Sequence, residues 1–301
     1  MPYKPFSSAD VMRRANLAGS LWMILSMAAF AVEDSLLKAA SANVPSGQIL
    51  MMFGFGGAVI FAAMAHVRGQ ALYTPDVTSP AMITRVGFEI TGRLFYMLAI
   101  VLTPLSTATV ILQATPLVVV VGAAVIFGER VGWRRWGAVA IGFAGVIVII
   151  GPGTDGFSAL SVLALVGMIG FAGRDLASRA APASISTQIL GLYGFLSLIA
   201  AGGLIGLWDG AAFLWPDADT WLVLAGATAC GVLAYGSLMK AMRTGEVSAV
   251  TPFRYTRLLF GVALGVLVFG ETLSASMILG SGLIVLSGLF VLWRGQRAVH
   301  P

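Results

Sequence analysis

Ten apolar runs, each long enough to cross a lipid bilayer as a helix, occupy most of the 301 residues. A membrane-spanning helix needs about 20 predominantly apolar residues. The loops between the runs are short, which leaves no room for a domain outside the membrane. We therefore predict an all-α integral membrane protein with ten transmembrane helices. The runs lie near 16–41, 47–67, 80–102, 104–128, 133–151, 158–180, 184–207, 218–243, 247–269 and 274–294.

The composition excludes several classes of protein. Charged residues make up 10% of the chain, whereas an ordinary soluble domain carries roughly 25%. So few charges cannot cover a water-facing surface, which excludes a soluble enzyme, a disordered chain and a nucleic-acid-binding protein. The single cysteine, Cys230, excludes an intrachain disulfide and a cysteine metal site, and His66 and His300 lie at predicted helix ends. We expect the lipid bilayer as surroundings, and no nucleic acid, metal site or cofactor.

Basic residues are concentrated in every second loop, which predicts the orientation of the chain. Cytoplasmic loops of membrane proteins carry an excess of lysine and arginine. With a cytoplasmic N-terminus, the cytoplasmic ends and loops contain Lys4, Arg13, Arg14, Arg68, Arg130, Arg134, Arg135, Arg179, Lys240, Arg243, Arg294 and Arg297. The opposite loops contain the acidic residues Asp155, Asp209, Asp217 and Asp219. Their one basic residue is Lys38, at the end of the first run. Both termini are therefore predicted to be cytoplasmic.

The two halves of the sequence resemble each other. Residues 30–40 match residues 171–181 at an offset of 141, and residues 127–130 match residues 269–272 at an offset of 142, which Ser106 and Ser248 share. Each half contains five runs, and because five is odd, the second copy enters the membrane from the other side. We predict two inverted five-helix repeats, 1–151 and 152–301. Inverted repeats are common in secondary transporters, which bind substrate near the midplane between the repeats.

Two motifs at repeat-equivalent positions connect the chain to a known family. Leu105-Ser106-Thr107-Ala108 leads through Pro116 to Gly128-Glu129-Arg130, and Val247-Ser248-Ala249-Val250 leads to Gly270-Glu271-Thr272. This pattern resembles the drug/metabolite transporter superfamily, in particular its EamA-type branch and the YddG-type bacterial amino-acid exporters. The resemblance implies ten helices, a central cavity and export across the bacterial inner membrane. Leu258 stands at the repeat position of Pro116, so a hinge role for this proline is not symmetric.

Several ionisable residues lie inside the predicted spans. Each costs about 2.5–3.5 kcal/mol at the centre of a bilayer, so such groups usually face a cavity or a partner. Arg85, Glu89, Arg93 and Tyr96 follow one another at spacings of 4, 4 and 3, which places them on one helical face. The candidate cavity residues are Glu89, Arg93, Tyr96, Gln113, Arg254, Tyr255, Phe30, Phe171 and Tyr235, with Arg257 beside them.

Structural roles compete with this interpretation. Glu89 between two arginines is also typical of an ion-pair ladder that supports a helix, and Arg254 and Arg257 can pair with Glu89 or with a carboxylate of the first or sixth run. Arg85, near a helix end, is expected to reach the interface. Asp34, Lys38, Asp175 and Arg179 occupy equivalent repeat positions and are predicted to be gate or helix-end charges. Glu129 and Glu271 are expected to cap helices or form packing corners.

Together these features predict a secondary transporter that exports amino acids or related small metabolites by alternating access. Arginine suits a carboxylate through paired hydrogen bonds, glutamate or glutamine suits an ammonium, and the aromatic residues can wall a side chain. Efflux of drugs, nucleotide sugars or organic acids remains the alternative. The sequence has neither a Ser–His pair at bilayer depth nor an Asp-rich motif, which disfavours an intramembrane enzyme. It has no filter sequence, which disfavours a channel. The fifth and tenth runs, almost without polar residues, are predicted to lie at the periphery, where a homo-oligomer can form.

Overall fold

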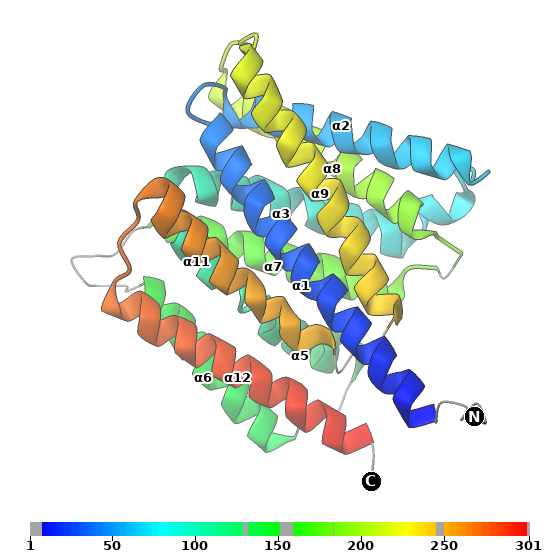
Figure 1. Ribbon diagram of the computed structural model, residues 1–301, viewed down its shortest axis with the longest axis vertical. Helices are drawn as coiled ribbons and strands as arrows, with labels where there is room; N and C mark the ends of the chain where they lie inside the picture. The colour runs from blue at the N-terminus through cyan, green and yellow to red at the C-terminus, as the bar shows by residue number, and fades with distance from the viewer. Residues whose placement is uncertain (1–7, 129–131, 151–158, 183, 245–249, 300–301) are drawn as a thin grey trace, which may run out of the picture.

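The computed structural model describes residues 8–128, 132–150, 159–182, 184–244 and 250–299, and these form helices joined by short turns (Figure 1). Some residues used to predict the repeat and the orientation lie outside this part of the chain: Lys4, Glu129, Arg130, Asp155 and residues 247–249. The helices are α1 (Ser8–Ala40), α2 (Ser46–Val67), α3 (Pro80–Leu102), α4 (Leu105–Leu112), α5 (Thr115–Phe127), α6 (Trp133–Ile150), α7 (Ser161–Ala180), α8 (Thr187–Asp209), α9 (Ala218–Thr244), α11 (Thr256–Phe269) and α12 (Ala275–Val299), with short 3₁₀ helices η1 (Pro75–Thr78) and η2 (Thr251–Tyr255).

These helices coincide with the ten predicted runs when α4 is taken with α5 and η2 with α11. The all-α prediction is confirmed for the described residues, which contain no strand. Six segments are long and apolar enough to cross a membrane: Arg14–Ala40, Ser46–Val67, Leu105–Ile126, Ser161–Ser178, Thr187–Asp209 and Ala218–Ala241. Although α3 is 23 residues long, Arg85, Glu89 and Arg93 interrupt its apolar sequence. The start of α1 and the end of α12 lie at the same end of the molecule (Figure 1).

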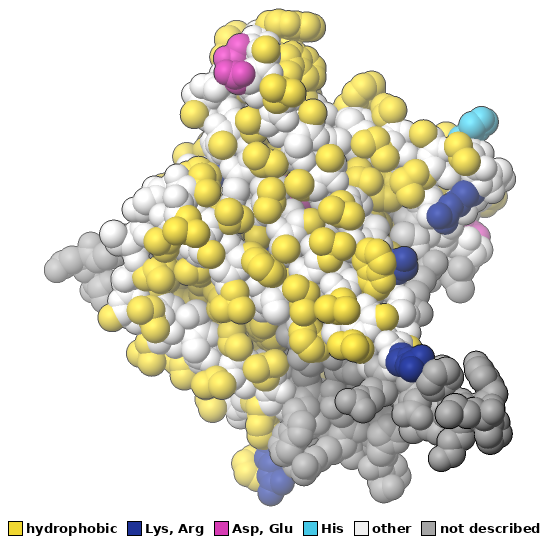
Figure 2. Space-filling model, in the orientation of Figure 1, with side chains coloured by type: hydrophobic (Ala, Val, Ile, Leu, Met, Phe, Trp, Pro, Cys, Tyr) yellow, Lys and Arg dark blue, Asp and Glu magenta, His cyan; other side chains and the backbone are white. Residues whose placement is uncertain are grey.

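Apolar side chains cover much of the surface of this bundle. Leu207 is 85% exposed, Leu267 82% and Val125 76%. Figure 2 shows hydrophobic side chains spread over the described part of one face, with most of the visible charged side chains near its edges. Contiguous apolar surface on this scale is not found on soluble monomers. The chain is therefore a multi-pass membrane protein whose apolar surface faces lipid.

The halves of the chain interleave rather than pack separately. The most extensive contacts pair α1 with α9, α2 with α8, α3 with α7 and α6 with α12, and each pair joins one helix from each half. In Figure 1, α6 and α12 lie together at one side of the molecule, while α1 and α9 run side by side across its middle. One buried core therefore contains residues from both halves.

Two irregular segments interrupt the helices inside the bundle. Pro116 has no N–H to donate, and between α4 and α5 the Thr115 hydroxyl donates to the Leu112 carbonyl at 2.5 Å. In the second half, η2 precedes α11. These segments meet where Gln113 Nε2 donates to the Arg254 carbonyl at 3.3 Å. Irregular backbone at membrane depth is found where protein or a cavity surrounds it.

Candidate functional site: a buried charge network

A close contact between α3 and α7 sets the position of the site. A Cβ atom on Gly170 would overlap the backbone of Gly92, and a Cβ atom on Gly92 would lie 2.7 Å from the Phe171 ring. The two glycines thus allow the helix backbones to approach closely. Glu89 lies one turn before Gly92 on α3, and Arg174 lies one turn after Gly170 on α7. Glu89 Oε1 and Arg174 Nη1 are 3.2 Å apart.

Glu89 is the centre of a group of arginines. Besides Arg174, its carboxylate lies 3.6 Å from Arg85 and 3.6 Å from Arg93, one turn before and one turn after it on α3. Both Glu89 and Arg85 are buried. Arg85 also donates to the Ser178 hydroxyl at 3.0 Å. The helical ladder expected from the sequence is present, and α7 adds a third guanidinium to it.

Two consecutive carboxylates on α1 extend the group. Glu33 accepts a hydrogen bond from Arg93 Nη1 at 3.0 Å, and Asp34 accepts bonds from Arg257 at 2.6 Å and from the Tyr96 hydroxyl at 3.1 Å. Glu33 is completely buried. Helices α1, α3 and α11, from both halves of the chain, are therefore joined by charges inside the bundle.

Asp175 forms the more open part of the group. Arg174 Nη2 lies 2.9 Å from its carboxylate, and Arg254 Nη1 lies 3.6 Å from the other oxygen. The side chains of Arg254 and Asp175 are 27% and 23% exposed, compared with 4% or less for Glu33 and Glu89. The group is therefore least enclosed on the Arg254 side. Arg257 pairs with Asp34 of α1, in the first span, and Arg254 pairs with Asp175 of α7, in the sixth span. The sequence had left these pairings open.

We call these residues the charge network: Glu33, Asp34, Arg85, Glu89, Arg93, Arg174, Asp175, Arg254 and Arg257. Its five arginines and four carboxylates, counted among the described residues, leave an excess of one positive charge. Some buried polar atoms in it have no hydrogen-bond partner in this part of the chain: Glu33 Oε2, Asp34 Oδ1, Arg85 Nη1, Arg93 Nε and Arg257 Nε. Buried charges without a full set of partners are costly, so the network has capacity for another polar ligand.

Aromatic rings cover the arginines. The guanidiniums of Arg174 and Arg93 lie 4.9 Å and 5.6 Å from the centre of the Phe171 ring, and that of Arg257 lies 5.0 Å from the Phe30 ring. Rings at this separation stabilise a cation through the negative face of the ring. Phe30 and Phe171, predicted as walls for a substrate, lie against the arginines.

Two tyrosines among the candidates have different surroundings. The Tyr255 hydroxyl lies against Gly288 of α12, where a Cβ atom would overlap it. The Tyr235 ring lies 5.5 Å from that of Phe61 and is close enough to interact electrostatically with Glu89 and Arg174 of the network. The Arg179 side chain lies outside the described part of the chain. Arg85, expected at the interface, is buried inside the bundle, so that expectation is wrong.

Glu33 and Arg174 were missed as candidates. They occupy equivalent positions, since Glu33-Asp34 aligns with Arg174-Asp175 at the offset of 141. The first half thus has an acid where the second has a base, and each residue pairs with α3, Glu33 with Arg93 and Arg174 with Glu89. A comparison of charge signs at equivalent positions could have identified both.

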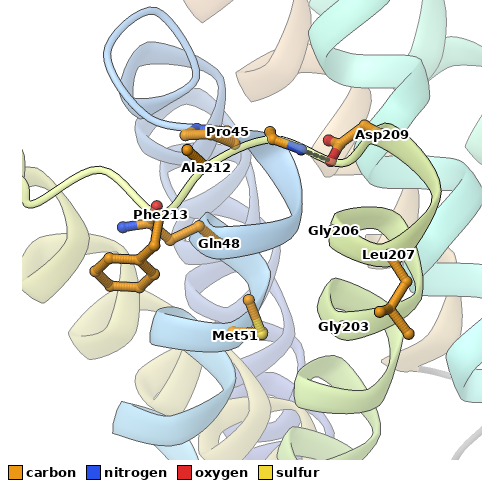
Figure 3. Close-up of a pocket in the computed structure, with 10 residues that line it drawn as sticks. Pro45, Gln48, Met51, Gly203, Gly206, Leu207, Asp209, Ala212 and Phe213 are labelled. Carbon is orange, nitrogen blue, oxygen red and sulfur yellow. Dashed lines mark hydrogen bonds between the residues drawn. The ribbon is translucent and has the colours of Figure 1, made fainter.

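A hollow of about 300 Å³ lies elsewhere, at one end of α2 and α8 (Figure 3). Gln48 anchors the adjoining loop, donating to the Leu214 carbonyl at 2.6 Å and accepting from its N–H at 3.0 Å. In Figure 3 the Met51 and Leu207 side chains lie on its two helical walls. None of the candidate cavity residues is in its described lining. The lining consists of Pro45, Gln48, Met51, Gly203, Gly206, Leu207, Asp209, Ala211, Ala212 and Phe213.

A lipid-facing helical bundle with an internal charge network, contributed by both halves, defines a polytopic membrane protein with a polar interior. The chain belongs to the EamA-like transporter family, whose sequence profile matches residues 17–151 and again residues 159–293. The resemblance to the EamA-type branch is therefore confirmed, and with it the assignment to the drug/metabolite transporter superfamily.

Several relatives match almost the whole chain. A riboflavin transporter of Vibrio cholerae is 28% identical over 289 residues, which cover 94% of this chain and 95% of the relative. An S-adenosylmethionine uptake transporter of Rickettsia prowazekii is 22% identical, covering 95% and 96%, and the pseudopaline exporter CntI of Pseudomonas aeruginosa is 26% identical, covering 90% and 94%. A solved crystal structure shares the fold with a TM-score of 0.62 and 21% identity, over 93% of this chain and 98% of that one. The riboflavin, S-adenosylmethionine and pseudopaline proteins are named as transporters or exporters of small metabolites.

Proposed function

We propose that this chain is a secondary transporter that carries small metabolites bearing a carboxylate, with amino acids as the first candidates, and exports them across the bacterial inner membrane. The observation that carries the proposal is the excess positive charge of a buried network contributed by both halves. Alternating access at this network, between the two repeats, is the proposed mechanism.

The proposed architecture is ten spans in two inverted repeats, 1–151 and 152–301. The pattern of helix contacts supports it. Exchanging equivalent spans of the two halves turns the contact of α1 with α9 into that of α7 with α3, and it maps the pairs α2 with α8 and α6 with α12 onto themselves. A two-fold relation between inverted repeats produces this pattern.

The exposure of Arg254 and Asp175 indicates where a substrate binds first. Their 3.6 Å separation is long for a charge-assisted hydrogen bond. A substrate carboxylate can therefore replace Asp175 at Arg254, while a substrate ammonium binds the released Asp175 or the oxygen of Gln113. The rings of Phe30 and Phe171 can then contact an apolar side chain. The excess positive charge disfavours a purely cationic drug.

The relatives widen the range of substrates to be tested. Their names include riboflavin and S-adenosylmethionine uptake as well as pseudopaline export. Organic acids, nucleotide sugars and drugs remain the alternative substrates. The aromatic rings of the network favour including riboflavin in a screen.

The orientation is tested with reporter fusions at either terminus and at the start of α6, beside Arg134 and Arg135. We expect cytoplasmic reporters to be active at all three positions and periplasmic reporters to be inactive, because lysine and arginine hold loops in the cytoplasm. Asp217, in the loop between α8 and α9, is the matched control position and is expected to give the opposite result. A periplasmic terminus contradicts the proposed topology.

The transport activity is tested with purified protein in liposomes. We expect saturable uptake of one or more radiolabelled amino acids, with acceleration by unlabelled substrate on the other side, because a carrier must return through its alternate state. Sugars, organic acids, riboflavin and a cationic drug complete the panel. Flux of the cationic drug without any amino acid contradicts the proposed substrate class, and flux that does not saturate indicates a channel.

A further inference from the structure

Three segments of the chain meet at the carboxylate of Glu271, which lies in the turn between α11 and α12. Glu271 accepts hydrogen bonds from the N–H groups of Leu105 and Ser106 at 2.6 Å and 2.9 Å and from the Ser106 hydroxyl at 2.6 Å. These donors are at the N-terminus of α4, where free N–H groups and the helix dipole favour an anion. A residue of the second half therefore caps a helix of the first half.

Lys38, in the last turn of α1, completes this contact. Its ammonium donates to the Thr103 carbonyl at 2.7 Å and lies 3.4 Å from Glu271 and 5.2 Å from the Phe269 ring centre. Burial raises the pKa of Glu271, but the hydrogen bonds of Ser106 and Leu105 and the charge of Lys38 outweigh it and leave the pKa below its usual value. The carboxylate is thus charged at neutral pH, and Lys38 holds α1 to both turns.

Glycine makes the close approach possible. Gly270 has a φ of 63°, which turns the chain so that the Glu271 N–H donates to the Gly265 carbonyl at 3.0 Å. A Cβ atom on Gly265 would lie 2.5 Å from the Glu271 carboxylate. One turn along α4, Thr109 packs at the same seam, where a Cβ atom on Gly261 would lie 2.5 Å from its methyl group. Both halves are therefore in direct contact along the seam between α4 and α11.

We propose that Lys38, Glu271 and the N–H groups of Leu105 and Ser106 form a latch that closes the non-cytoplasmic end of the substrate pathway. The inference rests on the proposed function. Arg254, where the charge network is most exposed, lies near Gln113 at the other end of α4, about 12 Å along the helix from Leu105. The proposed pathway is thus exposed at one end of α4 and tied at the other, and export requires the latch to break.

The latch is tested by the accessibility of a residue behind it. Thr109 is 1% exposed, and Thr109→Cys in a Cys230→Ser background gives a single thiol at the seam. Labelling with a membrane-impermeant maleimide is measured in right-side-out and inside-out vesicles that contain the full chain. Lys38→Met and Glu271→Gln remove one partner each, Lys38→Arg retains the charge, and Asp217→Asn is the control. Asp217 lies on the same side of the membrane and caps Thr220 at 2.8 Å without joining the halves.

We expect Lys38→Met and Glu271→Gln each to raise the labelling rate from the non-cytoplasmic side about 10-fold or more, since each removes a charge-assisted contact of the closed state. The double variant should add little to either change, and Lys38→Arg and Asp217→Asn should label like the parent. Unchanged labelling in both Lys38→Met and Glu271→Gln, with normal thermal unfolding, overturns the latch. Labelling needs no substrate, so a protein that transports nothing but shows the expected labelling contradicts the proposed function and leaves the latch intact.

Discussion

Glu89→Gln is expected to remove most of the folded protein. The substitution leaves Arg85, Arg93 and Arg174 around a neutral amide and raises the buried excess from one positive charge to two. Breaking a buried ion pair by neutralising one partner costs about 3–5 kcal/mol, which is a large fraction of the 5–15 kcal/mol that holds a typical domain together. The measurement is thermal unfolding of detergent-purified protein, with the yield of monodisperse protein as a second readout.

A compensating substitution separates charge from shape. Glu89→Gln combined with Arg85→Met restores the excess of one, and we expect it to recover a substantial part of the lost stability. Asp209→Asn is the control because Asp209 is an exposed carboxylate that accepts only from the Ala211 N–H, at 2.9 Å, among the described contacts. A Glu89→Gln protein that unfolds at the parental temperature contradicts the role assigned to Glu89.

Arg254→Ala is expected to give the largest loss of transport with little loss of fold. Arg254 is the most exposed arginine of the network, and its pairing with Asp175 is long. Loss of two charge-assisted hydrogen bonds to a carboxylate, each about 1.5–3 kcal/mol, predicts a fall in substrate affinity of about 100-fold or more. The measurement is the concentration dependence of amino-acid flux in liposomes. Arg254→Lys keeps the charge but not the paired hydrogen-bond geometry. Its substrate affinity should lie between those of the parent and Arg254→Ala.

Asp175→Asn provides a test with the opposite sign. If Asp175 competes with the substrate carboxylate for Arg254, its neutralisation should strengthen the binding of a purely anionic substrate and weaken that of a zwitterion. Lys240→Ala is the matched control, since Lys240 is a cation over the Trp22 ring, 3.9 Å from its centre, outside the network. Parental flux in Arg254→Ala excludes Arg254 from the substrate site.

The sequence predicted the helices more completely than the site. Apolar length determines where a span begins and ends, and α2 (Ser46–Val67) agrees within one residue with its predicted run, 47–67. The face containing Arg85, Glu89 and Arg93 followed from the helical period, since α3 is a regular helix. Tyr255 did not follow, because it is adjacent to Arg254 and consecutive residues point about 100° apart on an α-helix and about 120° apart on a 3₁₀ helix such as η2. Only one of the two can face the network, and the Tyr255 hydroxyl lies against Gly288 of α12.

The partners of each charge could not be read from one sequence. Arg257 pairs with Asp34 across 223 positions, and Glu271 caps α4 across 165 positions or more. Such pairs depend on how the two halves interleave, which local spacing does not contain. Arg85 shows the same limit: its place near a helix end predicted exposure, but the packing of α7 and α8 around it encloses the guanidinium.

The interleaving of the halves has a consequence for how the protein is made. The helices with the most extensive contacts are never from the same half, so the first five spans leave the ribosome before their partners exist. In the charge network, the first half contributes three carboxylates and two arginines, and the second half contributes three arginines and one carboxylate. The early spans thus wait in the bilayer with a net charge of −1 until spans with a net charge of +2 arrive. Glu33 and Glu89 already have Arg93 and Arg85 of the first half beside them, whereas the arginine partner of Asp34, Arg257, comes only with the second half. The opposite signs then attract the two halves to each other.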